Sequence, residues 1–582
     1  MDDLRVGSWV VAPSLNSISS GGRTVRLEPK VMGVLVCLAK HPGETLSKEQ
    51  LFQAVWPNIV VTEDVLKRCI AELRRAFDDD AREPRIIETI SKRGYRLVAP
   101  VTARSAAPAA AGSAVSDSIV VMPFVNMSGK AENEYFADGI TEEIINALAQ
   151  IAELHVVARS SAFSFKGKPI DPRIVGEQLN VRTVLEGSVR RTDNRLRITA
   201  QLVKSADGYH LWSERYDREM KDVFAIQDES ARSIAQRLQI SFEGGESRPL
   251  VKAGTQNLEA YQAYVKGRAL LYKRGPAIPR SLEYCQRAVT LDPEYGLAWA
   301  GLADAYTAHG YYGFASAQHS MPKGMDAALR AVTLDPLLAE AHNALAMASL
   351  MGTWDREVAK REFLRSLELN PKYLQARTWY ALFYLQFSER QLEEGMAQAK
   401  LAVVSDPLSG YAHAIYALTC MDVGKLDEAI EACRRGSEID PENYFALVVL
   451  QESLRLSGKL EESIAAGEVA LGMSGRHAWA MAYRALTFAD WGKSADADAV
   501  YSELLSRARH QYAPPGMLAI AASGAAREDD AVRHAREAFE TRDPHCQFWF
   551  TPSLPASARL YTYPGFREII ERMGRSAWLS AR

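Results

Sequence analysis

Hydrophobic residues recur every three or four positions between residues 62 and 77, which predicts an amphipathic helix. Its apolar stripe, expected to face a core, consists of Leu66, Ile70, Leu73 and Phe77. Its outer face and flanks carry Lys67, Arg68, Arg74 and Arg75, with Glu72 as the exception. Thr62 is a good N-cap, and arginines near a helix C-terminus are also what the helix dipole favours. The basic face therefore has two interpretations, a nucleic-acid surface or an ordinary solvated helix.

Two shorter helical patterns precede this helix, and a strand pair follows it. Pro29 predicts the start of the first helix, and Ser47 with Gln50 predicts a capping box at the start of the second. Residues 86–90 and 95–98 read as two strands joined by the basic turn SKRG. Residues 4–27 suggest a small antiparallel sheet. A sheet, three helices and a hairpin, in this order, predict a winged helix-turn-helix.

This region resembles the winged-helix effector domain of the bacterial OmpR/PhoB family, and within it the N-terminal domains of CadC-like and HilA-like regulators. The resemblance is carried by LEPK (27–30), LSKEQL (46–51), VWP (55–57), LRRAF (73–77) and RGYR (93–96). It implies that residues 62–77 are a recognition helix in the major groove and that the hairpin is a wing on the minor groove or backbone. It also implies that the loop of residues 57–61 can touch RNA polymerase.

The basic face and the resemblance together give the residues expected to contact double-stranded DNA: Thr62, Lys67, Arg68, Arg74, Arg75, Lys92 and Arg93. Arg68 is the best placed to read guanine, whereas Lys92 and Arg93 would approach phosphate from the wing tip. Glu72 would repel phosphate or accept from a cytosine amine. Residues 1–100 hold 15 basic and 13 acidic side chains. This near balance leaves open an alternative, a repeat-based interaction scaffold whose winged helix no longer binds DNA.

A segment rich in Ala, Ser, Pro and Gly, residues 101–117, predicts a flexible linker. Residues 118–245 alternate strand and helix patterns, with a further strand expected at 153–165. Their runs VMPFVN, FADGITEEI, VLEGSVRR, WSERYDRE and FAIQDE resemble the N-terminal α/β domain of TolB-like proteins, also seen in the FlgO family. We interpret Asp138, Glu142 and Glu143 as the solvated start of a helix rather than as an acid/base or metal cluster.

Ala-rich helical patterns repeat through residues 257–550. The tripeptides LDP, LDP, LNP, SDP and IDP recur, and the intervals between their prolines are 43, 35, 36 and 34 residues. This period, with Pro at helix boundaries, resembles tetratricopeptide repeats, in five or six units with an insertion near residues 309–321. Residues 551–582 predict a capping helix. The repeats are expected to bind a protein or peptide partner in their concave groove.

Composition narrows the function classes. The net charge of the 582 residues is −3, so any DNA site must be a local basic surface. Six cysteines without a CxxC pair indicate a reducing compartment rather than disulfides or zinc. No uncharged apolar run approaches the roughly 18 residues of a membrane span, so we expect a cytoplasmic protein that does not bind a membrane. No P-loop, HExxH, GxSxG or kinase motif occurs, so no catalytic residue, cofactor or metal is expected.

These patterns together predict a multidomain α+β protein: an N-terminal winged helix, a central α/β TolB-like domain and a C-terminal all-α repeat solenoid. The expected function is sequence-specific DNA-binding transcriptional regulation, with the α/β and repeat regions sensing a partner or ligand and setting the oligomeric state. The winged helix starts at residue 1 without a receiver domain before it, so a phosphorelay is not the expected input. The linker stands where CadC-like regulators have a membrane helix.

Overall fold

The computed structural model divides into two compact units, residues 1–114 and 115–582. It describes residues 4–7, 9–12, 17–20, 23–55, 63–80, 84–90, 93–99, 101–103, 118–129, 133–149, 151, 154–168, 170–192, 195–219, 233, 254–552 and 554–580. Most of the predicted linker and the end of the predicted α/β domain beyond residue 219, apart from Ser233, lie outside these residues.

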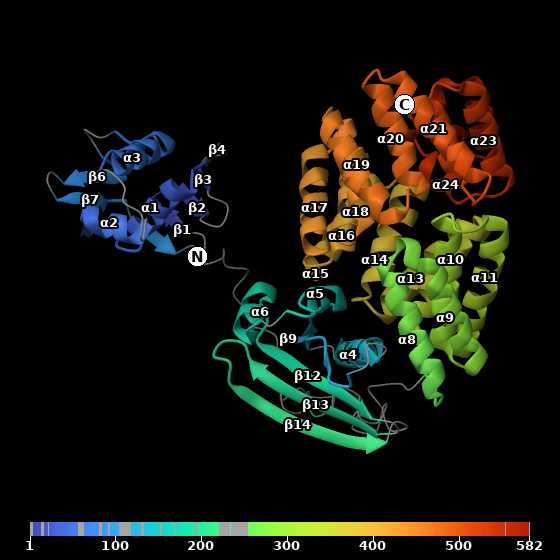
Figure 1. Cartoon of the computed structure of the whole chain (residues 1–582), viewed down its shortest axis with the longest axis horizontal. Helices are drawn as coiled ribbons and strands as arrows, with labels where there is room; N and C mark the ends of the chain where they lie inside the picture. Colours follow the sequence, from blue (N-terminus) through green and yellow to red (C-terminus); the bar gives the residue numbers. More distant parts are fainter. Residues whose placement is uncertain are drawn as a thin grey trace. The chain divides into compact units, whose positions relative to one another are not determined.

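The N-terminal unit begins with an antiparallel sheet in the order β4–β3–β2–β1–β8 (Figure 1). Its strands are β1 (Leu4–Val6), β2 (Trp9–Ala12), β3 (Ser17–Ser20), β4 (Arg23–Arg26) and β8 (Val101–Ala103). β8 pairs with β1 along its whole length. The predicted start of the linker at residue 101 is therefore wrong, because the free edge of β1 takes up residues 101–103 as a further strand.

The rest of this unit holds α1 (Pro29–Ala39), β5 (Thr45–Leu46), α2 (Lys48–Val55), α3 (Glu63–Phe77), β6 (Ile87–Ile90) and β7 (Gly94–Leu97). Pro29 is the first residue of α1, as predicted. The capping box is confirmed, because the Ser47 backbone N–H donates to Gln50 Oε1 at 2.8 Å and the Gln50 N–H donates to Ser47 Oγ at 3.2 Å. One hydrophobic core joins the sheet to the helices, with the Trp9 ring edge-on to Phe77.

The middle domain is an α/β layer in the second unit, with strand order β11–β9–β12–β13–β14 and β10 beside β12. Its strands are β9 (Ser118–Val121), β10 (Val125–Asn126), β11 (His155–Val156), β12 (Thr183–Thr192), β13 (Arg195–Lys204) and β14 (His210–Glu219). Its helices are α4 (Glu134–Ala149), α5 (Arg159–Phe163) and α6 (Pro172–Leu179). The strand predicted at 153–165 shrinks to β11, and the small residues that follow form α5.

Eight helical hairpins follow within the described residues, in the second unit (Figure 1). They are α8 (Leu258–Lys273) with α9 (Ile278–Leu291), α10 (Gly296–Tyr311) with α11 (Ala317–Leu334), α12 (Ala339–Ala348) with α13 (Arg356–Leu369), α14 (Leu374–Trp379) with α15 (Leu392–Ser405), α16 (Gly410–Asp422) with α17 (Leu426–Ile439), α18 (Tyr444–Leu456) with α19 (Leu460–Ser474), α20 (Ala478–Asp490) with α21 (Ser494–Ala508), and α22 (Pro515–Gly524) with α23 (Glu528–Glu540). α12 and α14 continue as the π-helices η5 (Ser349–Thr353) and η6 (Tyr380–Ser388), and α24 (His545–Trp549) and α25 (Pro564–Arg572) close the array.

The predicted five or six repeats are too few. No Asp-Pro or Asn-Pro boundary stands before α8 or before α22, so the period did not reveal these two hairpins. Asn257 caps α8 instead, and α22 starts at the second residue of a Pro-Pro pair. The capping helix expected near the C-terminus is confirmed as α25.

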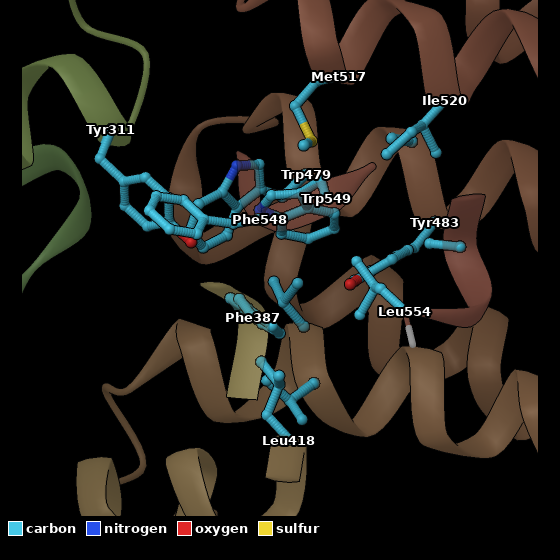
Figure 2. Close-up of a cluster of buried hydrophobic side chains, with 14 of the residues drawn as sticks. Tyr311, Phe387, Leu418, Trp479, Tyr483, Met517, Ile520, Phe548, Trp549 and Leu554 are labelled. Atoms are coloured by element: carbon cyan, nitrogen blue, oxygen red, sulfur yellow. The ribbon is translucent and has the colours of Figure 1, made fainter. Parts of the chain in front are cut away.

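The long first interval between prolines is taken up by the long helices α10 and α11. The residues at the junction of these two helices contact the last hairpins. The Tyr311 ring centre lies 5.1 Å from that of Trp479 and 5.3 Å from that of His545. The backbone carbonyl of Tyr312 lies 2.6 Å from His477 Nε2. Figure 2 shows Tyr311 and Trp479 of this cluster together with Phe548 and Trp549 of α24. Here the first helices of the hairpins enclose the chain's own side chains rather than an open groove.

The middle domain contacts the loops that precede α14 and α16, and its helix α4 packs on α8. Ser161 of α5 donates from its backbone N–H, at 2.9 Å, and from its hydroxyl to the Asp406 carboxylate, and the hydroxyl accepts from the Leu408 N–H at 3.0 Å. Lys372 Nζ donates to the Leu154 carbonyl at 3.0 Å. The middle domain and the hairpins are thus joined by specific polar contacts.

The acidic residues Asp138, Glu142 and Glu143 were expected at a solvated helix start, and this interpretation is wrong. α4 begins at Glu134, so all three lie further along the helix, on the wall of a cavity shared with the hairpins. Asp138 is buried and its carboxylate contacts Lys166 Nζ at 2.6 Å. The acids therefore belong to an internal polar surface.

Candidate nucleic-acid interface

The helix α3 has the two-sided character expected of it. Leu66, Ile70, Leu73 and Phe77 are all buried, which confirms the predicted stripe, and Cys69 and Ala76 extend it. The opposite side exposes Lys67, Arg68, Ala71 and Arg75. Ala71 carries only a methyl group, so the long basic side chains around it can approach a flat or grooved surface. The geometry therefore offers a basic helix face backed by a packed core.

Two contacts fix α3 and its neighbours in place. Lys30 Nζ of α1 donates to the Val55 carbonyl at the end of α2, at 2.8 Å. At the end of α3, the Arg74 guanidinium donates to the Ile87 carbonyl at 2.9 Å and to Thr89 Oγ1 at 2.8 Å. Arg74 thus ties α3 to the strand β6 of the wing. Its use on DNA remains a prediction, and its observed partners are in the protein.

Asp79 anchors the start of the wing and was missed by the reasoning from sequence. Its carboxylate accepts three backbone N–H groups, from Arg85 at 2.7 Å, Ile86 at 3.1 Å and Ile87 at 2.8 Å. The side chain is buried although it stands among three consecutive aspartates, Asp78 to Asp80. That acidic run just after a helix was the available signal, but it does not show which aspartate turns inward.

The wing is a short hairpin, with β6 and β7 in antiparallel register. Its cross-strand pair Glu88 and Arg96 forms an ion pair at 2.6 Å. Gly94 has φ +146, and a Cβ there would lie 1.9 Å from the Leu46 carbonyl oxygen, so β5 and β7 approach closely only because residue 94 is glycine. Arg93 is exposed beside the tip. The predicted contacts Thr62 and Lys92, and the loop of residues 57–61, lie outside the described residues.

Residues 22–97 match the family described as "Transcriptional regulatory protein, C terminal". The N-terminal domain is a winged-helix DNA-binding domain of the OmpR/PhoB type. A curated relative, the transcriptional activator CadC of Escherichia coli (strain K12), is 46% identical over 99 residues, which are 17% of this chain and 19% of CadC. The transcriptional regulator HilA of Salmonella typhimurium is 25% identical over 406 residues, which are 67% of this chain and 68% of HilA. The winged-helix domain is followed by the middle α/β domain and then by a helical repeat region that resembles tetratricopeptide proteins.

A third relative belongs to another class. A protein named putative adenylate cyclase 3, of Rhizobium meliloti, is 45% identical over 187 residues, which are 32% of each chain. The chain thus spans about a third or less of the length of this relative and of CadC. The relatives named as regulators agree with a non-enzymatic role, although this one is named as an enzyme. Within the described residues no group of three or more His, Cys, Asp or Glu could hold a metal ion.

Every helix in the described part of the chain is too short or too polar to cross a lipid bilayer. The cysteines Cys37, Cys69, Cys285, Cys420, Cys433 and Cys546 are all unpaired, and all except Cys37 are buried.

Proposed function

We propose that this protein is a sequence-specific DNA-binding transcriptional regulator. The observation that carries the proposal is the match of residues 22–97 to a transcriptional-regulator family, on a domain whose α3 exposes Lys67, Arg68 and Arg75 over a packed core. A helix of this kind enters the major groove, and the adjoining wing reaches the neighbouring minor groove or backbone. The named regulators CadC and HilA support the same role.

The basic residues take different parts in the proposed complex. Arg68, central on the exposed face, would bind guanine through two parallel hydrogen bonds, and Lys67 and Arg75 would lie over the flanking phosphates. Lys92 and Arg93 at the wing, and Thr62 before α3, would add contacts to the DNA backbone. Arg74 would act mainly by holding the wing against α3, because its guanidinium is occupied by Ile87 and Thr89.

Residues 115–582 would receive the signal. The 187 residues shared with the putative adenylate cyclase exceed the 114 of the N-terminal unit, so part of that shared sequence lies in residues 115–582. This segment would occur both in a regulator and in a protein named as a cyclase, which have different outputs. It therefore suits an input module, which receives a signal, better than an output module, which acts on DNA or substrate. The input module would consist of a TolB-like domain followed by the repeats, and its partner would be a protein or peptide. Contact of the chain with RNA polymerase, or its self-association, would complete the regulation.

The test uses duplexes selected from a random library by the full chain and compares three variants. Arg68→Ala removes charge and base contact, whereas Arg68→Lys keeps the charge but loses the bidentate fork. We expect both to lose selectivity at one base pair, worth about 1–3 kcal/mol, and only Arg68→Ala, which also removes a positive charge, to lower the salt dependence of binding. Arg287→Ala, an exposed arginine on α9, is the control for net charge.

Selection of no consensus sequence by the full chain would contradict the proposal and favour the interaction scaffold instead. A consensus that Arg68→Ala and Arg68→Lys read as well as the wild type would instead remove Arg68 from the interface. In that outcome the proposed function stands and the reading residue must be sought among the other exposed residues of α3.

A further inference from the structure

A cavity of about 1690 Å³ lies between the middle domain and the hairpins, within residues 115–582. One wall comes from α4 and α5, and the other from the first helices α8, α12, α14 and α16. These are the helices that form the inner surface of a tetratricopeptide array, here covered by the middle domain. The volume exceeds the roughly 300–1,000 Å³ of common small-molecule pockets. The cavity therefore has room for a molecule longer than a single amino acid.

Arg274 stands on the wall of this cavity without a direct ion pair among the described residues: the buried Asp304 carboxylate acts on it electrostatically but is paired with Arg268 at 3.3 Å. The residue is only 7% exposed, and its guanidinium has no hydrogen-bond acceptor among the residues that the structure describes. Its contacts are two ring faces, Tyr411 at 4.5 Å and Trp379 at 5.7 Å. Trp379 Nε1 donates to the Tyr411 hydroxyl at 3.1 Å, which fixes the two rings. A guanidinium removed from water and left unpaired is costly, and an anion bound in the cavity would offset that cost.

The backbone at Arg274 is also strained. Its φ is +58, a region that a long side chain rarely adopts and that costs on the order of 1–3 kcal/mol. The turn after α8 accepts this conformation, and the side chain ends on the cavity wall. The turns of other hairpins hold the same conformation at Trp354, Arg390 and Ala526, so the positive φ belongs to the hairpin turn and what bears on a ligand is the side chain on the cavity wall.

The other end of the cavity is acidic. Glu143 of α4 and Glu340 of α12 both line the cavity, and neither has an ion-pair partner in the described part of the chain. Burial, with Glu142 and Glu340 next in effect, raises the pKa of Glu143 to about 8, and burial also raises the pKa of Glu340. Glu142 differs, because its carboxylate is paired with Arg159 at 3.0 Å. An ammonium group bound here would replace protons as the counter-charge of the two free acids.

The helix α8 gives the separation of the two ends. Arg268 of α8 lines the cavity with Glu143 and Glu340, lowers the pKa of both acids, and is itself paired with Asp304 at 3.3 Å, so it lies near the acidic end. Six residues of helical rise separate Arg268 from Arg274, which is about 9 Å. An extended chain spans at most about 3.3–3.6 Å per residue, so three or four residues bridge the two ends.

We propose that this cavity binds a short peptide of about three or four residues with free termini. Its terminal carboxylate binds Arg274, and its terminal amino group binds Glu143 and Glu340. The peptide lies between α4 and the hairpins and so bears on how the middle domain and the hairpins pack. The inference rests on the proposed role of residues 115–582 as the input module, and it names the class of ligand for that module.

Proton release is a signature of the proposed amino-group subsite. Three charged groups face Glu143 from the elements packed around it: Glu142 on the same helix, Glu340 on α12 and Arg268 on α8. With its pKa near 8, Glu143 is largely protonated at pH 7 in the empty cavity. A bound ammonium favours the ionised form, so binding at pH 7 should release a proton from the protein. Calorimetry in two buffers of different ionisation enthalpy measures this release.

The experiment uses the full chain with trialanine, tetra-alanine and an equimolar tripeptide library as probes. Each alanine peptide is compared with its N-acetyl form, its C-terminal amide and free alanine. We expect binding to the unmodified peptides, and at least about tenfold weaker binding when either terminus is blocked, since a lost ionic contact of about 1.4 kcal/mol is tenfold. Arg274→Met should abolish the effect of the free carboxylate, Glu143→Gln should abolish proton release, and Arg287→Ala should bind like the wild type.

Stability separates a ligand site from a structural role of Arg274. If Arg274 waits for an anion, Arg274→Met without peptide melts at or above the wild-type temperature, because an unpaired buried charge is gone. Glu143→Gln keeps the proposal testable if Arg274→Met does not fold. The proposal is overturned if no probe binds, if blocked and free peptides bind equally, or if Arg274→Met binds the peptides normally. Selective DNA binding that persists in any of these cases leaves the proposed function intact.

Discussion

Replacing Asp79 should loosen the wing while leaving the basic face of α3 unchanged. The carboxylate collects the N–H groups of Arg85, Ile86 and Ile87 just where β6 begins. In Asp79→Asn one oxygen becomes an amide N–H₂, which cannot accept. If the remaining oxygen keeps Arg85 and Ile86, the amide donor faces the Ile87 N–H, and the start of β6 loses its anchor.

The expected magnitude follows from these contacts. A hydrogen bond to a charged group contributes about 1.5–3 kcal/mol, and a buried donor left without an acceptor costs about 1–3 kcal/mol. The Ile86 and Ile87 donors are buried, whereas Arg85 is near solvent and can turn to water. Asp79→Asn should therefore destabilise the wing by about 2–4 kcal/mol. The matched change Asp78→Asn has an exposed side chain and the same loss of charge, and it should cost less than about 0.5 kcal/mol.

Hydrogen exchange followed by mass spectrometry on the full chain measures the local stability of the wing. At tenfold per 1.4 kcal/mol, peptides covering residues 86–97 should exchange about 30 to 1,000 times faster in Asp79→Asn, and nearly unchanged in Asp78→Asn. Peptides from the hairpins serve as an internal reference. Equal exchange in the two variants would refute the reasoning, because the loss of charge and not the three N–H contacts would then be the cause.

Three other outcomes are expected. Gly94→Ala should lower the stability in thermal unfolding by more than about 2 kcal/mol, because its Cβ would overlap the carbonyl of β5. The control Gly43→Ala, also at positive φ but with open space around it, should cost about 1 kcal/mol. Similar losses in the two variants would argue against the close approach of β5 and β7. Ser161→Ala should speed hydrogen exchange in α5 by an amount equivalent to about 1–3 kcal/mol, and Ser164→Ala, whose hydroxyl bonds within its own segment, should not. Burial lowers the pKa of His477 to about 4, below its ordinary value, so the unfolded chain takes up a proton first and stability falls as pH falls from about 6.5 towards 4. Urea unfolding at pH 7 and pH 4.5 should show His477→Asn losing about 2–3 kcal/mol less than the wild type, and parallel losses would contradict the assignment.

The N-terminal domain was readable from the sequence because its signals are local. Pro29, the Ser47 and Gln50 capping box, and the buried stripe of α3 depend on residues close together in the chain, and the structure confirms each. Asp79 and Arg74 were not readable in the same way. Their partners lie six to fifteen residues away across a turn, and only the folded wing brings them together.

The second unit shows the opposite limit. The spacing of the prolines predicted the repeats. A hairpin without a preceding Asp-Pro or Asn-Pro, such as α8 with α9, has the same fold but was not predicted by that spacing. The acids of α4 looked solvated because a helix start is the usual place for them. What sequence could not supply was the other wall of the cavity, since Glu340 lies about two hundred residues from Glu143 and meets it only when the hairpins stack.

The contact of Tyr311 and Tyr312 with Trp479, His477 and His545 changes what kind of array this is. A linear repeat protein depends on neighbours only, so units can be added, removed or melted from an end with local effect. Here the second hairpin contacts the seventh, and Phe548 and Trp549 of α24 pack against Tyr311 and Trp479 (Figure 2). Losing a single unit would misalign a bridge fixed at two distant points. The contact between the second and seventh hairpins thus fixes how many hairpins lie between them. We expect this array to unfold in one cooperative transition rather than fray from its last helix.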